Sequence, residues 1–143
     1  MKVLFTLICF GLIMYLNAEI IKQSEFTVKD TRTNILWQDT KEVNSIKRDF
    51  NEAKTYCESL KLDGYNDWKI PSFMELFSIV NTKSYNPTLS KEFKYFKSEN
   101  YWTSKKFSHG ASGEAFVVNF LSGAFNRESM DNKFYVRCFR NEK

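Results

Sequence analysis

Lysines and aromatic residues alternate through one stretch of the chain, from Lys83 to His109. The stretch contains six lysines and only two acidic residues, so its formal charge is +4. Lysines attract anions, and exposed aromatic rings can stack on sugars. A solvated loop is the alternative interpretation of the stretch, and core packing is the alternative for Trp102, which has apolar neighbours. We predict a site for a polyanion or glycan, and its candidate residues are Lys94, Lys97, Tyr101, Trp102, Lys105 and Lys106.

The same sequence offers no recognisable catalytic constellation. His109 is the only histidine, and Ser108 lies too close to it in sequence to form an obvious nucleophile–base pair. Three cysteines and one histidine also exclude zinc ribbons and multi-histidine metal centres. We therefore expect a protein that is not an enzyme and that uses no cofactor or metal. The alternative is an envelope enzyme, or an enzyme-accessory domain, whose catalytic groups follow no familiar motif.

The first 18 residues have the order of a secretory signal peptide. Lys2 gives a positive start, residues 3–16 are almost wholly apolar, and the run ends at Ala18. This order predicts cleavage after Ala18, whereas a membrane anchor usually needs about 20 apolar residues. An uncleaved anchor is the alternative. We expect one periplasmic or secreted domain at residues 19–143, with no stable membrane insertion and no nucleic acid partner.

Two amphipathic helices are expected in the first half of this domain. The apolar face of the first has residues three and four positions apart, namely Phe50, Ala53, Cys57 and Leu60. Asp49 and Glu52 have the form of a capping box at its start, and Ser72 and Glu75 repeat that form for the second helix. The expected buried face of the second helix consists of Phe73, Leu76, Phe77, Ile79 and Val80.

Strands are expected on either side of these helices. Residues 25–29 and 35–38 are β-prone runs separated by a polar turn, which predicts a hairpin. Residues 116–120 and 124–127 flank a tight-turn signal, and residues 134–140 form the last strand. From Asn81 to His109 the pattern of residues is irregular. The fold class expected is therefore α+β, with two helices packed on a small antiparallel sheet and long loops between them.

The two cysteines that remain after export are expected to form one disulfide bond. Oxidising compartments favour disulfides, and both cysteines lie on apolar faces. Cys57 lies on the apolar stripe of the first helix, and Cys138 shares one face of the last strand with Phe134 and Val136. A helix packed on a sheet would bring Cys57 and Cys138 together.

Several short motifs follow one another along the chain. They are Ile35-Leu36-Trp37-Gln38-Asp39, Ala53 to Leu60, Gly64 to Pro71, Tyr101-Trp102-Thr103-Ser104 and Tyr135 to Arg140. Their order resembles the Lcl C-terminal domain family, long catalogued as a domain of unknown function. The resemblance covers about residues 27–140 and implies a compact C-type-lectin-like fold, akin to that of formylglycine-generating enzymes. It also implies a bridge from a helix cysteine to the final strand, which matches Cys57 and Cys138.

The founding member of that family is an adhesin whose domain binds sulfated glycosaminoglycans and host-surface proteins. The resemblance therefore implies an exported, non-catalytic and adhesin-like binding module. Its expected partner is an anionic glycan or an envelope or host surface protein.

Overall fold

The computed structural model describes residues 19–108 and 113–143. The predicted signal peptide at residues 1–18 and the histidine at position 109 lie outside the described residues. In the described part of the chain, no helix is long and apolar enough to cross a membrane.

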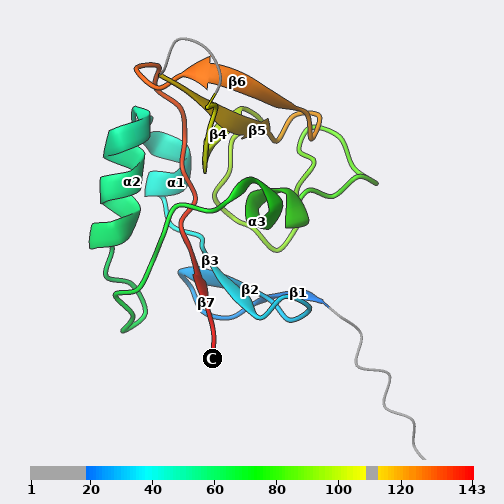
Figure 1. The fold of residues 1–143 in the computed structure, drawn as a ribbon. Helices are drawn as coiled ribbons and strands as arrows, with labels where there is room; N and C mark the ends of the chain where they lie inside the picture. The colour runs from blue at the N-terminus through cyan, green and yellow to red at the C-terminus, as the bar shows by residue number, and fades with distance from the viewer. Residues whose placement is uncertain (1–18, 109–112) are drawn as a thin grey trace, which may run out of the picture.

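The first sheet joins the two ends of the described chain. It contains β1 (Ile20–Lys22), β2 (Thr27–Asp30), β3 (Ile35–Gln38) and β7 (Phe139–Asn141), in the order β1-β2-β3-β7. Every neighbouring pair is antiparallel. The hairpin predicted from residues 25–29 and 35–38 is confirmed as β2 and β3, whereas β1 has no counterpart among the predicted strands. This sheet lies at the lower end of the molecule in Figure 1.

The second sheet lies at the opposite end and forms a meander (Figure 1). It contains β4 (Asn100–Lys106), β5 (Glu114–Asn119) and β6 (Phe125–Ser129), all antiparallel. The predicted tight turn between β5 and β6 is present at Gly123. Its φ of +77° suits glycine, and a Cβ atom at this position would lie 2.9 Å from a methyl group of Val80.

The helices are short, and two of the three in the described residues begin as the capping pattern predicts. They are α1 (Glu42–Ser45), α2 (Phe50–Ser59) and α3 (Phe73–Ser78). Asp49 accepts a hydrogen bond from the Glu52 N–H at 2.8 Å, and the Glu52 side chain accepts one from the Asp49 N–H at 3.0 Å. Ser72 and Glu75 form the same reciprocal pair before α3. Both predicted capping boxes are therefore confirmed.

The predicted fold class, α+β with two helices packed on a small C-type-lectin-like sheet, is wrong. The described part of the chain is mostly β, with two antiparallel sheets of four and three strands and three helices of only 4, 10 and 6 residues. One cause is β4, which lies in the stretch of irregular pattern. A register shift between Trp102 and Lys106 interrupts the two-residue alternation by which a strand is recognised.

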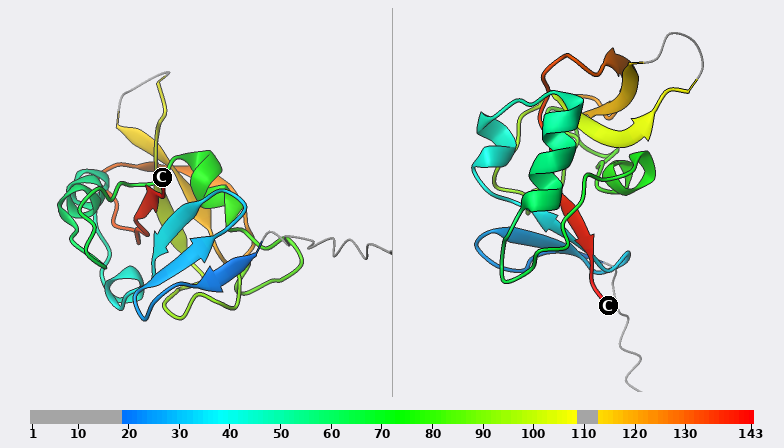
Figure 2. Two further views of the ribbon diagram at one scale, coloured as in Figure 1. Left: turned by 90° about the horizontal axis from the view of Figure 1, so that it is seen from below. Right: turned by 60° about the vertical axis from the view of Figure 1, so that its left-hand side comes forward.

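Two apolar clusters fill the interior. The first cluster surrounds Trp37 and packs β2 and β3 against α3, and the second surrounds Trp68 and Trp102 beside α2. Residues 134–140 run between the two clusters, along the middle of the molecule (Figures 1 and 2). Along this segment Tyr135 and Phe139 enter the first cluster, while Val136 and Cys138 enter the second. The predicted alternation of this segment is confirmed, although only its end is a regular strand.

The predicted disulfide bond is present between Cys57 of α2 and Cys138. The two Cα atoms are 5.4 Å apart, and both residues are fully buried. The bond therefore fixes α2 to the central segment (Figure 2).

Candidate functional site

The strand β4 divides the predicted binding residues between the core and the surface. Its first half is buried at Tyr101, Trp102 and Thr103, and its end is exposed at Lys105 and Lys106. This division follows from the position of the strand, which starts inside the molecule and runs out to the surface.

The rings of Tyr101 and Trp102 are core components. Tyr101 packs edge-on against Phe120 at 5.0 Å between ring centroids, and its hydroxyl accepts a hydrogen bond from the Lys97 N–H at 2.8 Å. Trp102 donates from Nε1 to the Arg48 carbonyl at 2.9 Å. Burial raises the pKa of Tyr101, although the charge of Arg137 opposes the rise. Neither ring is accessible for stacking on a ligand, since both residues have no exposed surface.

A different set of aromatic side chains lies beside the two exposed lysines. A groove of about 740 Å³ separates the start of α3 from the sheet β4-β5-β6. Its floor is formed by Phe116 and Phe125, and its wall by Phe73 and Met74. The remaining lining residues are Ser72, Ser104, Lys105 and Lys106.

The aromatic rings of the groove belong to a continuous row. Phe73 stacks on Phe77 at 5.6 Å and meets the edge of Phe125 at 5.1 Å. Phe125 in turn contacts Phe116 at 6.5 Å, and Phe116 contacts Phe107 at 6.4 Å. Met74 and Phe125 are 72% and 60% exposed, which is unusual for large apolar side chains. The row therefore presents apolar surface to solvent.

The charges beside the groove are positive. Lys105 is exposed on its rim, while the Lys106 ammonium lies 5.4 Å from the centroid of the Phe50 ring. The Arg127 guanidinium lies 4.2 Å from the centroid of Phe107 and 3.7 Å from a carboxylate oxygen of Glu114. None of the described residues that line the groove is acidic.

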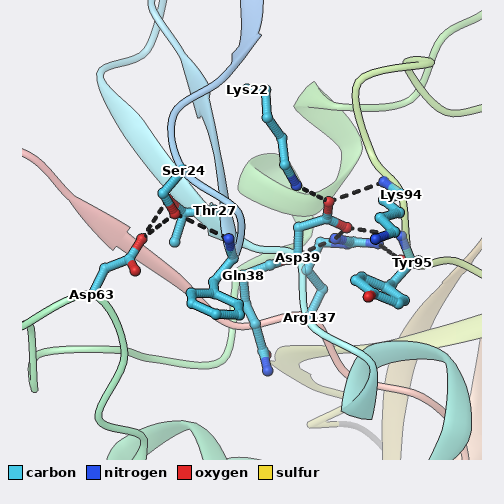
Figure 3. Close-up of polar contacts among 10 residues, drawn as sticks. Lys22, Ser24, Thr27, Gln38, Asp39, Asp63, Lys94, Tyr95 and Arg137 are labelled. Carbon is cyan, nitrogen blue, oxygen red and sulfur yellow. Dashed lines mark hydrogen bonds and ion pairs between the residues drawn. The ribbon is translucent and has the colours of Figure 1, made fainter.

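Lys94 and Lys97 lie elsewhere, on the loop that precedes β4. The Lys94 N–H donates to the carboxylate of Asp39 at 2.9 Å, and the ammonium of Lys94 lies 5.0 Å from the ring centroid of Tyr95 (Figure 3). Neither lysine lines the groove. The predicted residues are thus distributed over three places: the core, this loop and the groove.

Asp39 anchors that loop to the interior. It accepts hydrogen bonds from the N–H groups of Lys94 and Tyr95, and it pairs with Lys22 and with the buried Arg137 (Figure 3). Burial disfavours the charged form of Asp39, but Arg137 and these hydrogen bonds outweigh burial and lower its pKa. Arg137 also donates to the carbonyls of Gln38 and Tyr95. The cluster is structural, because its carboxylate and both terminal guanidinium nitrogens are bonded within the protein, and only the buried Arg137 Nε has no hydrogen-bond partner among the described residues.

The described residues show no gathering of three histidine, cysteine, aspartate or glutamate side chains that could hold a metal ion.

The predicted core face of α3 is only partly buried. Leu76 and Ile79 are in the core, whereas Phe77 is 36% exposed and Phe73 borders the groove. Sequence reasoning therefore missed the apolar residues of the groove. Their only signal was an excess of apolar positions on a short helix and a neighbouring hairpin.

Taken together, these features define a small disulfide-linked β domain with an amphipathic surface groove. A comparison with family models matches residues 26–140 to the Lcl C-terminal domain. The chain belongs to the Lcl C-terminal domain family, as its motifs suggest. A comparison with curated protein sequences finds no match.

Proposed function

We propose that this domain is an exported, non-catalytic recognition module that binds an anionic ligand in the groove between α3 and the sheet β4-β5-β6. The observation that carries the proposal is the groove itself. Its exposed phenylalanine and methionine side chains lie beside Lys105 and Lys106, with no acidic residue among the described lining residues. A ligand with apolar and anionic groups complements both properties.

The lysines of the groove are placed to attract such a ligand from solution. Exposed charges act over about 8 Å at physiological ionic strength, so binding that depends on them weakens as salt rises. Replacing Lys105 gives the clearer test of anion binding. Lys106 also lies over the Phe50 ring, and losing a cation–π contact of this kind costs about 0.5–1 kcal/mol.

Export is supported by the N-terminal sequence pattern and by the disulfide bond, since disulfides persist in oxidising compartments. N-terminal sequencing of the protein recovered from the periplasm or the medium is expected to begin at Glu19. A sequence that begins at Met1 would refute cleavage.

Chromatography on immobilised heparin, a sulfated glycan, tests the anion site. The domain is expected to elute at higher salt than a neutral protein of similar size, and Lys105→Glu, alone or with Lys106→Glu, is expected to lose that retention. The matched control is Lys83→Glu with Lys91→Glu, which makes the same charge change as the double variant at exposed lysines outside the groove. Equal loss in both double variants would show that only net charge matters and would overturn the proposal.

A further inference from the structure

The strand β6 is an exposed edge of the second sheet. Within residues 19–108 and 113–143 it pairs only with β5, and four of its five residues are exposed. In Figure 1 it lies along the top of the molecule, on the far side of β5 from β4. An edge strand of this kind can accept a further strand from another chain.

The main-chain groups of Phe125 and Arg127 point away from β5. At the two ends of the pair, the Ala124 carbonyl accepts from the Asn119 N–H and the Met130 N–H donates to the Gly113 carbonyl. Bonded positions alternate along an antiparallel pair. The even-numbered residues of β6 therefore bond to β5, and the odd-numbered residues face outward. No hydrogen bond from the described loops reaches the main chain of Phe125 or Arg127.

The groove reaches this free edge. It crosses the face of the sheet from Lys105 on β4, over Phe116 on β5, to Phe125 on β6. Arg127 lies opposite Phe116 in the register, so its side chain shares this face. A strand added beside β6 would direct every second side chain to the face that carries Phe125 and Arg127.

The charged side chains near the groove and β6 indicate which kind of added strand would bind there. Lys105, Lys106 and Arg127 border the groove and its edge, with Glu114 as the one described acidic partner of Arg127. A second copy of this chain would bring the same positive side chains to the interface, and pairing about Arg127 would set like charges opposite one another. Charge complementarity favours an acidic partner.

From these observations we propose that β6 binds an extended peptide segment of a partner protein by strand addition, with apolar side chains entering the groove and acidic ones meeting its lysines. The proposal rests on the groove being the ligand site, and it names the ligand class. The peptide main chain would bond to the outward N–H and carbonyl groups of Phe125 and Arg127. This mode obtains affinity from the main chain and specificity from alternate side chains.

A synthetic peptide of about nine residues, in which glutamate alternates with valine and phenylalanine, is the probe. Amide exchange of the domain of residues 19–143 is followed by NMR with and without the peptide. Saturating peptide is expected to slow exchange of the Phe125 and Arg127 amides by about tenfold or more. A peptide of the same sequence that is N-methylated at alternate positions, so that it cannot bond to the edge, is expected not to bind.

Two substitutions at Arg127 distinguish the contribution of its main-chain N–H to peptide binding from that of its side chain. Arg127→Pro removes an outward N–H, which an edge strand tolerates, and it is expected to abolish peptide binding. Arg127→Ala keeps the N–H and is expected to weaken binding only severalfold. If Arg127→Pro fails to fold, the N-methylated peptide still tests the same hydrogen bonds from the ligand side.

The outcomes distinguish this inference from the proposed function. Retention on heparin that depends on Lys105, without protection of Phe125 and Arg127 by the peptide, would refute strand addition and leave the anion site standing. Loss of both would refute both. A third outcome is that, without peptide, protection of the two amides grows with protein concentration. That result would show that a second copy of the chain binds the edge, and it would overturn the peptide assignment.

Discussion

Asp39 and Arg137 form the ion pair on which the packing of the lysine-rich loop depends. Both side chains are fully buried, and together they hold the N–H groups of Lys94 and Tyr95 and the carbonyl of Gln38. Burying two charges is costly, but removing one partner of a buried pair is more costly still, because the other charge is left uncompensated.

We predict that Asp39→Asn lowers the free energy of unfolding by about 3 kcal/mol or more. The control is Glu58→Gln, which removes a carboxylate from the exposed pair with Lys54 and is expected to cost about 1 kcal/mol or less. Urea denaturation of both variants measures the difference. Equal losses would show that Asp39 is no more important than a surface carboxylate.

The lowered pKa of Asp39 predicts a dependence of stability on pH. Because its pKa is lower in the folded protein than in the unfolded chain, its contribution is complete above about pH 4 and is lost as the pH falls through the folded value. The free energy of unfolding, measured between about pH 6 and about pH 2, should therefore decline at the acid end. The decline should be shallower in Asp39→Asn, and an unchanged slope would contradict the assignment.

At the scale of elements, the disulfide bond links α2 to the segment that precedes β7. It closes a loop of about 82 residues, for which the chain-entropy model gives roughly 4.5 kcal/mol as an upper figure. We predict that Cys57→Ala with Cys138→Ala lowers the free energy of unfolding, measured by urea denaturation, by an amount that approaches this value. Thiol titration of the unreduced, unfolded domain of residues 19–143 should find no free cysteine, and two free thiols would refute the pairing.

The elements that could be predicted from the sequence are those whose signal is local. Reciprocal capping by Asp49 with Glu52 and by Ser72 with Glu75 depends on residues three positions apart. The pairing of β4 and the burial of its aromatic residues depend on contacts with distant segments, such as Tyr101 with Tyr135. Composition alone therefore placed Tyr101 and Trp102 in a binding site, whereas tertiary packing places them in the core.

The groove was harder to predict because it exists only between elements. Phe73 and Phe125 are far apart in the sequence, and they meet because α3 packs on the second sheet. Lys105 was identified from the charge of its segment, but the aromatic residues that accompany it come from α3, β5 and β6. No spacing rule within one segment connects them.

At the scale of the whole molecule, the two core clusters share their strands. Trp37 and Leu36 are neighbours on β3, yet they enter different clusters, and the same is true of Val117 and Val118 on β5. Loss of one cluster would expose the opposite face of strands that the other cluster needs. The two sheets are therefore expected to unfold together.

This expectation can be measured with tryptophan fluorescence. In Trp37→Phe the remaining tryptophans, Trp68 and Trp102, report only on the second cluster. Their unfolding curve in urea should coincide with that from far-UV circular dichroism, which reports on both sheets. Separate midpoints would show that the clusters unfold independently.

The position of residues 135–140 also determines when the fold can form. This segment supplies Arg137 to Asp39, Cys138 to Cys57 and Phe139 to Trp37, so each cluster lacks a central component until it arrives. A ribosome delivers these residues after Asp39, Cys57 and Trp37, the partners that they contact. The emerging chain therefore cannot complete either cluster until residue 140 has been added.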